Sequence, residues 1–425
     1  MKIKLLKPSL LLFTALLISN IGKAQSYTTT IDTFYVSTPE YSATLGLDSL
    51  YFPSAITTPN TGNNFPVLIL VHGTSALDKD ANSTKDYLDS IGASYRKAET
   101  HMFYEIADSL SRNGIIVLRY DKRSFTLNCI EKPACWYVDT ITPYDYIKDI
   151  HNAINFAKNI PLADTCNIFL AGHSQGGSFV SQVGYDRSDI RGVLNMAGTA
   201  QPIDSVSIYQ EEFVNSNPLG ADVLREQFDS LRMGLWPMTD TLYNNHFSPR
   251  FWLDWISHTD SAILVQKNSN KPTALMYCTA DKFVPPSTHY QIWLDSVTRP
   301  NVTFELFSNL DHSFGSEYDS TMSPQVLTFM TNWIESTKIN CGSAQIAEFQ
   351  NNSSLSIYPN PGSNLISVKA INLPDNKFWI TNLTGKTIIQ GELKTDVPFH
   401  IDISHFPKGI YILRTNSTAN KFSKY

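Results

Sequence analysis

The sequence contains no run of lysine or arginine beyond its first seven residues, and only 17% of its 425 residues are charged. Its 33 Lys and Arg against 39 Asp and Glu leave a formal charge of −6, so the basic surface that binds nucleic acid is missing. Long apolar runs are confined to the start, which argues against membrane spanning by the mature chain. The 42% of hydrophobic residues suffice for a large core, and the length predicts two domains or three.

Cysteine is scarce and odd in number, with five residues that cannot all pair within one chain. Cys129 and Cys135 are close in sequence and enclose a Lys-Pro step suited to a closed loop, so we predict a disulfide between them. Cys166 and Cys278 fall in apolar, strand-like runs and are predicted to be small buried hydrophobes. No short Cys and His spacing resembles a zinc site, so we expect no metal.

Residues 1–24 have the pattern of an export signal. Three lysines within the first seven residues precede the apolar stretch 10–18, and Gly22-Lys23-Ala24 places small residues where a signal peptidase cleaves. We expect the mature chain to begin at Gln25. The alternative is a membrane anchor, but the apolar stretch is shorter than the roughly 20 residues that span a bilayer.

Residues 25–339 alternate short β-branched runs with longer amphipathic ones, which is typical of an α/β fold with a doubly wound, mostly parallel sheet. Amphipathic helices are predicted over 101–113 and 144–159. Six runs are apolar almost throughout, as strands covered by helices on both faces are: 67–71, 115–118, 168–171, 193–196, 273–277 and 302–307.

A long insertion, about residues 201–270, interrupts the alternation. Because ligands enter open α/β sheets beyond the carboxyl ends of strands, we predict a helical lid over an apolar pocket; additional helical core is the alternative. The insertion is rich in aromatic residues: Tyr209, Phe213, Trp236, Tyr243, Phe247, Phe251, Trp252 and Trp255.

The composition changes after residue 339. Residues 340–354 are polar and aperiodic, which predicts a linker. Residues 355–425 alternate with period two in short runs separated by turns, which predicts a small all-β sandwich as the C-terminal domain.

The string Gly172-His-Ser-Gln-Gly176 follows the apolar run 168–171 and precedes a helical stretch. A serine on so sharp a strand-to-helix turn exposes its hydroxyl, and Gly172 and Gly176 allow the neighbouring backbone to approach. The amino end of the helix favours a developing oxyanion at the same place. We therefore predict Ser174 as a nucleophile; a tight structural turn is the alternative.

A nucleophilic serine requires a base and an orienting acid. His312 follows the last apolar run and Asp281 the one before it, so the chain order is serine, aspartate, histidine. Asp311 is the rival acid, but neighbours in an extended chain point apart. His151 and His289 lie in helical stretches and are predicted to face solvent.

Two backbone N–H groups are needed to stabilise an oxyanion. His72 and Gly73 close the run 67–71, so Thr74 is expected to supply one donor and Gln175 the other. The alternative is that Gly73 merely permits a turn. The charged strings 78–80 and 119–123 follow two strands and are predicted to form structural ion pairs near the rim of the site.

With these motifs, residues 43–335 resemble an α/β-hydrolase of the bacterial serine-esterase type. That group ends its oxyanion strand in His-Gly-Ser-Gly-Pro, followed by Asp-Arg-Asp. The string His72-Gly-Thr-Ser-Ala-Leu-Asp-Lys-Asp80 departs from it at Thr74, Ser75 and Lys79. The resemblance implies a Ser-His-Asp mechanism without a cofactor, with Ser75 in place of the second glycine of the oxyanion motif.

The last 70 or so residues are similar to the C-terminal sorting domain of type IX secretion substrates in Gram-negative bacteria. The matching strings are Ile357-Tyr-Pro-Asn-Pro361, Asn382-Leu-Thr-Gly-Lys386, residues 403–413 and Lys424 near the end. The resemblance implies passage through the periplasm and contact with the type IX machinery. It also implies release to the cell surface or medium. A carbohydrate-binding sandwich is the alternative.

Together these features predict a secreted serine hydrolase that acts on a small-molecule ester through an acyl-enzyme, without metal or organic cofactor. The alternatives are a serine peptidase on the same fold, such as an aminopeptidase or prolyl peptidase, and a surface binding protein that has lost activity. The fold serves several chemistries, so it does not name the substrate.

Overall fold

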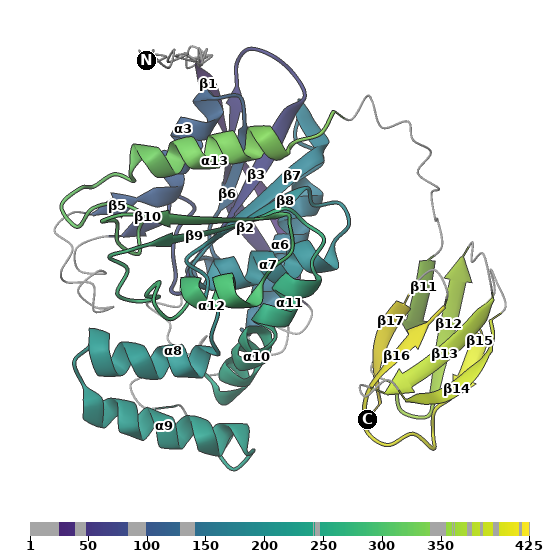
Figure 1. Cartoon of the computed structure of the whole chain (residues 1–425). Helices are drawn as coiled ribbons and strands as arrows, with labels where there is room; N and C mark the ends of the chain where they lie inside the picture. The colour runs from purple at the N-terminus through teal and green to yellow at the C-terminus, as the bar shows by residue number, and fades with distance from the viewer. Residues whose placement is uncertain are drawn as a thin grey trace, which may run out of the picture. The chain divides into compact units, whose positions relative to one another are not determined.

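The chain divides into two compact units, residues 1–339 and 340–425, shown in the computed structural model of Figure 1. The structure describes residues 25–38, 48–83, 99–127, 141–240, 242, 247–340, 354–358, 360, 362–371, 376–382, 386–393, 399–415 and 419–424. The predicted signal segment, Cys129, Cys135 and most of the predicted linker lie outside these ranges.

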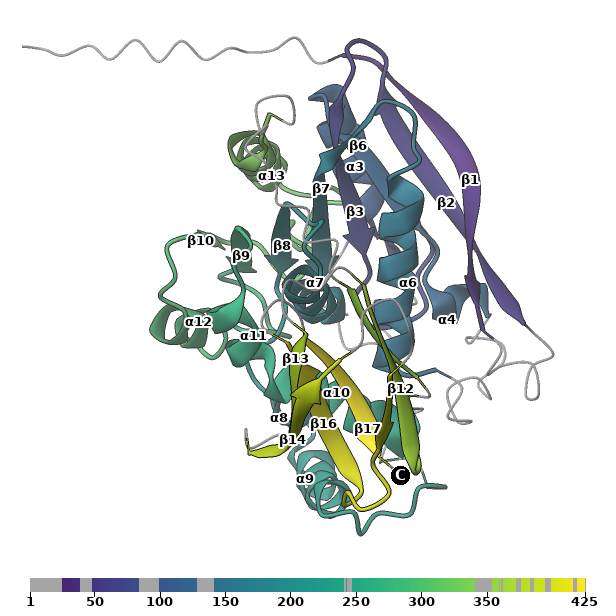
Figure 2. The ribbon, with the colours of Figure 1, turned by 90° about the vertical axis from the view of Figure 1, so that its right-hand side faces the viewer.

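The first unit is built on an eight-stranded sheet in the order β1-β2-β6-β3-β7-β8-β9-β10. The hairpin of β1 and β2 is antiparallel and forms one edge (Figure 2), while the strands from β6 to β10 run parallel. All six apolar runs are strands of this sheet, which confirms the predicted mostly parallel α/β architecture. The strands are β1 (Tyr27–Ser37), β2 (Ser49–Pro59), β3 (Phe65–Val71), β6 (Ile116–Tyr120), β7 (Ala163–His173), β8 (Gly192–Met196), β9 (Thr273–Cys278) and β10 (Val302–Phe307). A separate two-stranded pair joins β4 (Asn82–Ser83) to β5 (Thr100–His101).

Helices cover both faces of the sheet, and β3 shows how one strand serves two cores. Val67, Ile69 and Val71 pack with α6 (Pro143–Ala157) and α7 (Gln175–Asp186). Leu68 and Leu70 pack with α3 (Met102–Arg112) and α13 (Pro324–Thr337). Successive side chains of a strand point to opposite faces, so a run apolar at every position is buried on both sides. Two short helices, α4 (Arg123–Thr126) and α12 (Tyr290–Ser296), complete this part of the unit.

The insertion folds into helices gathered at one end of the sheet (Figure 1). Proline and a polar cap begin two of them: Asn217 accepts a hydrogen bond from the Gly220 N–H, and Ser248 accepts one from the Phe251 N–H. The elements are α8 (Ile203–Tyr209), a π-helical turn (Gln210–Val214), α9 (Pro218–Arg232), α10 (Pro249–Asp260) and α11 (Ala262–Asn268).

The second unit is all β, as predicted. Its described strands form a three-stranded sheet, β11-β12-β15, and a four-stranded sheet, β14-β13-β16-β17. Apolar residues from both sheets share one core, including Ile366, Val368, Ile380 and Leu413. The strands are β11 (Ser354–Tyr358), β12 (Leu365–Ile371), β13 (Lys377–Asn382), β14 (Thr387–Glu392), β15 (Phe399–Asp402), β16 (Gly409–Arg414) and β17 (Ala419–Lys424).

One cysteine prediction is wrong and one is confirmed. Cys166 is exposed near the start of β7 and is disulfide-bonded, to a partner outside the described residues. It lies before the buried stretch of that strand, so it is not the small buried hydrophobe that the apolar run suggested. Cys278 is buried in β9 with a free thiol, as predicted.

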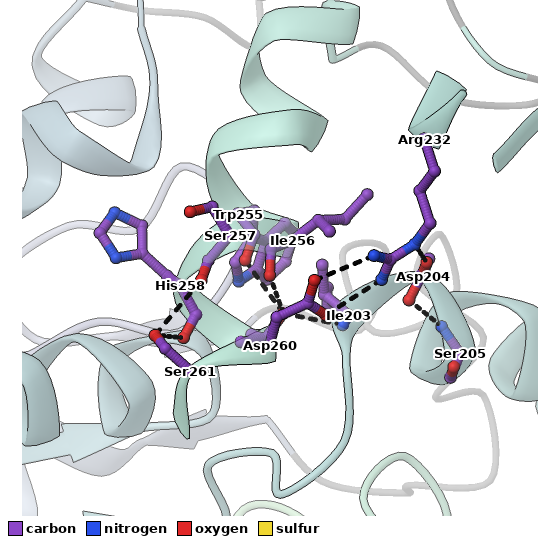
Figure 3. A network of polar contacts seen from close by, with 11 residues as sticks. Ile203, Asp204, Ser205, Arg232, Trp255, Ile256, Ser257, His258, Asp260 and Ser261 are labelled. Atoms are coloured by element: carbon purple, nitrogen blue, oxygen red, sulfur yellow. Dashed lines mark hydrogen bonds and ion pairs between the residues drawn. The ribbon is translucent and has the colours of Figure 1, made fainter. Parts of the chain in front are cut away.

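Three helices of the insertion are tied together by Arg232 at the end of α9 (Figure 3). Its guanidinium forms an ion pair with Asp204 of α8 and a two-bond contact with Asp260 of α10, at 2.9 and 3.0 Å. Paired N–H groups match the two oxygens of a carboxylate, so this contact fixes orientation as well as distance.

We expect Arg232→Ala to loosen this helical insertion without unfolding the protein. Arg232 is about one-third exposed, so the loss of stability should stay near 1 kcal/mol. Limited proteolysis with mass spectrometry should find faster cleavage within residues 201–270. The matched control is Arg225→Ala on the same helix, α9. Arg225 forms more exposed ion pairs, with Glu212 and Asp222, and the substitution removes them. Equal cleavage rates in the two variants would contradict this role of Arg232.

Candidate active site

Ser174 occupies a sharp turn between β7 and α7. Its φ of +53° lies in the left-handed region that non-glycine residues avoid, at a cost on the order of 1–3 kcal/mol. The Ser174 N–H donates to the Met196 carbonyl at 2.8 Å, which fixes the turn against β8. The Ser174 hydroxyl makes no hydrogen bond to another described residue. Ser174 lines a cavity of about 330 Å³, hereafter the main cavity.

Two glycines allow the backbone to pack tightly around this turn. A Cβ atom on Gly172 would lie 2.1 Å from the Gly176 carbonyl oxygen, and one on Gly176 would lie 2.4 Å from the Val71 carbonyl oxygen. Both distances are too short for any side chain. The turn is therefore pressed against the end of β3, which brings Ser174 beside Gly73 and Thr74 in the same cavity.

His312 and Asp281 lie in the loops that follow β10 and β9, and they contact each other. His312 Nδ1 donates to Asp281 Oδ2 at 2.7 Å. The other Asp281 oxygen accepts the Phe283 and Val284 N–H groups at 2.8 and 2.9 Å, so the carboxylate is held in place and is only 4% exposed. The neighbouring Asp311 instead accepts the Ser313 N–H at 2.9 Å.

The surroundings of His312 set its basicity. Burial alone would lower the pKa of His312, but the charge and hydrogen bond of Asp281, with the charge of Asp311, outweigh burial and hold that pKa above its usual value. His312 lines the same cavity as Ser174. The His173 ring lies 4.7 Å from the His312 ring, and its Nε2 donates to the His312 carbonyl at 2.8 Å.

The loop after β3 forms another wall of the cavity. Neither the Thr74 N–H nor the Gln175 N–H has an acceptor within the part of the chain that the structure describes. Ser75 stands where the His-Gly-Ser-Gly-Pro motif of bacterial serine esterases has its second glycine, and it adopts a φ of +85°. The loop thus takes the glycine-like conformation despite carrying a side chain there.

His72 has a structural place next to this loop. Its Nε2 donates to the Tyr120 carbonyl at 2.7 Å, and its ring lies 4.6 Å from the Phe103 ring. Burial lowers the pKa of His72 to about 3, so the ring is neutral near pH 7.

The predicted ion pairs near the rim form in part, since Asp78 accepts hydrogen bonds from Asn82 and pairs with no described cation. Arg119 pairs with Asp80 at 2.7 Å, and Lys79 lies 4.0 Å from Asp121. Lys122 differs: no described carboxylate pairs with it, and its Nζ instead donates to the Gly73 carbonyl and to Gln175 Oε1, at 2.5 and 2.8 Å. Lys122 was therefore wrongly assigned to an ion-pair network.

The main cavity joins Ser174, His312 and the loop after β3 to the helical insertion. The insertion contributes apolar walls: Ile203, Val206, Leu224, Phe247, Trp252 and Trp255. The insertion also contributes Glu211, whose carboxylate accepts hydrogen bonds from the amides of Asn215 and Asn217. The helical insertion therefore forms part of the cavity wall and part of the core, where Phe251 is buried. Phe213 of the same insertion is exposed.

The prediction that His289 faces solvent is wrong. His289 is 2% exposed and precedes α12, and its Nδ1 accepts the Ala200 N–H at 3.1 Å. Burial lowers the pKa of His289 to about 4. His151 is half-buried on α6, within hydrogen-bond distance of Arg187.

The described residues offer no group of three or more His, Cys, Asp or Glu side chains arranged to hold a metal ion. None of the helices in the described ranges is both long enough and apolar enough to cross a bilayer.

We expect acid to unfold this protein through its buried neutral histidines. The folded-state pKa of His289 is about 4, below the unfolded value of 6.5, so unfolding takes up a proton. The contribution of neutral His289 to the free energy of unfolding is complete above pH 6.5 and is lost as the pH falls toward 4. His289→Gln retains an acceptor for Ala200 and cannot titrate, so its unfolding free energy should depend less on pH by a few kcal/mol across that range. Denaturant titrations at several pH values measure this, with exposed His101→Gln as control; an unchanged slope in His289→Gln would contradict it.

Known proteins resemble the first unit. Esterase EstD of Thermotoga maritima is 28% identical over 266 residues, which cover 61% of this chain and 57% of that protein. The chain thus spans a little over half the length of this curated relative. Among solved structures, Est1E from Butyrivibrio proteoclasticus matches with a TM-score of 0.42 and 13% identity, over 72% of this chain and 96% of that one. The 2,6-dihydroxy-pseudo-oxynicotine hydrolase matches with a TM-score of 0.46 and 14% identity, over 72% and 68%.

Two family models match separate parts of the chain. Residues 356–425 match the secretion system C-terminal sorting domain, as their strings indicated. Residues 96–319, more than half of the chain, match the model described as serine aminopeptidase S33. The protein therefore belongs to the serine aminopeptidase S33 family of α/β-hydrolases and carries a secretion sorting domain at its C-terminal end.

Proposed function

We propose that this protein is an exported serine hydrolase that cleaves carboxylic esters, with Ser174, His312 and Asp281 as its catalytic residues. The observation that carries the proposal is the hydrogen bond between His312 and Asp281, in which His312 lines one cavity with a serine held at positive φ. In unliganded enzymes the bond between serine and base is often long and tightens with substrate, so the free Ser174 hydroxyl is compatible with this role.

In the first step Ser174 Oγ attacks the ester carbonyl carbon. His312 Nε2 takes the hydroxyl proton, and Asp281 stabilises the imidazolium through the Nδ1–H bond. The carbonyl π electrons move onto oxygen, which the N–H groups of Thr74 and Gln175 receive. The raised pKa of His312 makes it a better acceptor for this proton.

The second step divides the substrate. When the tetrahedral intermediate collapses, the bond from carbon to the alcohol oxygen breaks and the alcohol leaves with the proton from His312. An acyl group then remains on Ser174 Oγ. Water then removes the acyl group by the same two steps. His312 accepts a proton from water as its oxygen adds to the carbonyl carbon, and Ser174 leaves with that proton.

Two features favour an ester with an apolar acyl group. Phe247, Trp252 and Trp255 line the cavity beneath the lid, where burial of an apolar chain is favourable. The protein known as Esterase EstD is similar over 61% of this chain.

Export follows from the two ends of the chain. Residues 1–24 would direct the chain to the periplasm, and residues 356–425 match a secretion sorting domain. We propose that the type IX machinery recognises this domain, carries the protein through the outer membrane, and leaves the hydrolase unit at the cell surface or in the medium.

We expect Ser174→Ala to lower ester turnover by about 10⁶-fold and Asp281→Asn by about 10⁴-fold, because the latter leaves His312 without its orienting charge. Asp311→Asn is the matched control, since an asparagine oxygen still accepts the Ser313 N–H; its loss should stay below about tenfold. The assays are hydrolysis of p-nitrophenyl esters of increasing chain length and labelling by a fluorophosphonate. Undiminished turnover in Ser174→Ala would overturn the proposal.

Glu211 favours a second candidate, an aminopeptidase, within the same site. Glu211 lines the cavity, its carboxylate accepts hydrogen bonds from the neutral amides of Asn215 and Asn217, and no cation within the described residues pairs with it. A buried carboxylate is stabilised by a positive partner, which the ammonium group of a free amino terminus would provide. An ester of an uncharged acyl group would not use it.

A single substitution separates the two candidates. For an aminopeptidase, Glu211→Gln should raise KM for aminoacyl anilides about tenfold or more while leaving simple esters unchanged. For an esterase of neutral substrates, wild type should hydrolyse p-nitrophenyl butyrate well above any aminoacyl anilide, and Glu211→Gln should change neither KM.

A further inference from the structure

Lys122 lies behind the loop that follows β3, on the side away from the catalytic cavity. It is 5% exposed and lines a separate small cavity with Tyr146 and Asp149. Gly73, Thr74 and Gln175 line the main cavity instead. The Lys122 side chain therefore reaches this loop from the protein interior, where substrate does not enter.

The contact with Gly73 orients the next N–H group. Lys122 Nζ donates to the Gly73 carbonyl at 2.5 Å. In a planar trans peptide the C=O of one residue and the N–H of the next point in opposite directions. Holding the Gly73 carbonyl toward Lys122 therefore turns the Thr74 N–H toward the main cavity.

The contact with Gln175 fixes the second donor. Lys122 Nζ donates to Gln175 Oε1 at 2.8 Å. Burial lowers the pKa of Lys122 to about 7, and its N–H groups donate in either protonation state. Gln175 is the first residue of α7, so its own N–H has no partner within the helix. One lysine side chain thus holds both residues whose N–H groups are proposed to receive the oxyanion.

The loop needs such support because its conformation is strained. Ser75 stands at φ +85°, where the resembling esterases have glycine. The Ser75 carbonyl accepts the Ser124 hydroxyl at 3.2 Å, so residues 122 and 124 hold the loop from behind at two points. Residue 123 anchors that support: the buried Arg123 guanidinium donates twice to Asp149, at 2.5 and 2.9 Å.

We propose that Lys122 is a positioning residue of the oxyanion hole, which holds the Thr74 and Gln175 N–H groups in line by gripping the Gly73 carbonyl and the Gln175 side chain. The inference rests on the oxyanion hole of the proposed function. Lys122 does not touch the substrate. It acts by fixing donors in advance, so that they need no rearrangement when negative charge develops on the carbonyl oxygen.

The test compares an aryl butyrate with its thiono analogue, in which sulfur replaces the carbonyl oxygen. Sulfur is a weak hydrogen-bond acceptor, so an oxyanion hole accelerates the thiono ester little. Lys122→Met should lower kcat for the oxygen ester about 10- to 100-fold, with KM nearly unchanged. The thiono ester should slow by less than about threefold, so the ratio of the two rates should fall.

Three further variants sharpen the comparison. Lys122→Arg retains a cation that donates, and it should restore much of the rate ratio. Lys79→Met makes the same change at a partly exposed lysine of the neighbouring loop and should leave both rates at wild-type level. Gln175→Met removes the other end of the contact and should lower the ratio even where Lys122→Met does not fold.

The outcomes are distinct. A fall in the rate ratio for Lys122→Met or Gln175→Met, with recovery in Lys122→Arg, supports the inference. Equal slowing of both esters, or no slowing, overturns it while the proposed function stands. A wild-type enzyme that hydrolyses neither ester overturns the proposed function and this inference with it.

Discussion

The arrangement of the candidate site depends on one close contact between backbones. The Gly176 backbone packs against the end of β3 so tightly that a Cβ atom there would lie 2.4 Å from the Val71 carbonyl oxygen and 2.6 Å from that of His72. Because no side chain intervenes, the turn with Ser174 and the loop with Thr74 form adjoining walls of one cavity. His312 reaches that cavity, with Asp281 bonded to it, because parallel strands end at the same edge of the sheet.

Much of the fold could be predicted from sequence because its strongest signals are local. Strands buried on both faces are apolar almost throughout, and five of the six apolar runs are such strands. The sixth run is β10, which lies at the edge of the sheet and is only partly buried. The β1–β2 hairpin gave no comparable signal: most of β1 is exposed, so its residues are not a continuous apolar run. The pairing of His312 with Asp281 was suggested by their places after consecutive strands, and its geometry agrees with that order.

Other features depend on contacts between distant residues, which no local pattern reveals. Lys122 sits in a charged string, and nothing in that string shows that its ammonium lies near the Gly73 carbonyl, 49 residues away. His289 follows two prolines in a polar stretch, yet it is buried against Ala200, 89 residues away. Cys166 was misjudged because the apolar run beside it begins two residues later, so the strand is exposed where the cysteine stands.

The free thiol of Cys278 also bears on how such a protein survives oxidation. Thiol–disulfide exchange requires a thiolate that can reach a disulfide sulfur. Burial raises the pKa of the Cys278 thiol, and the charges of Asp281 and Asp311 add to the effect. Cys278, at the end of β9, is fully buried. Cys278 therefore remains protonated and out of reach. An odd thiol held in this way does not reshuffle the disulfide at Cys166, so the folded chain tolerates an oxidising compartment without a partner for every cysteine.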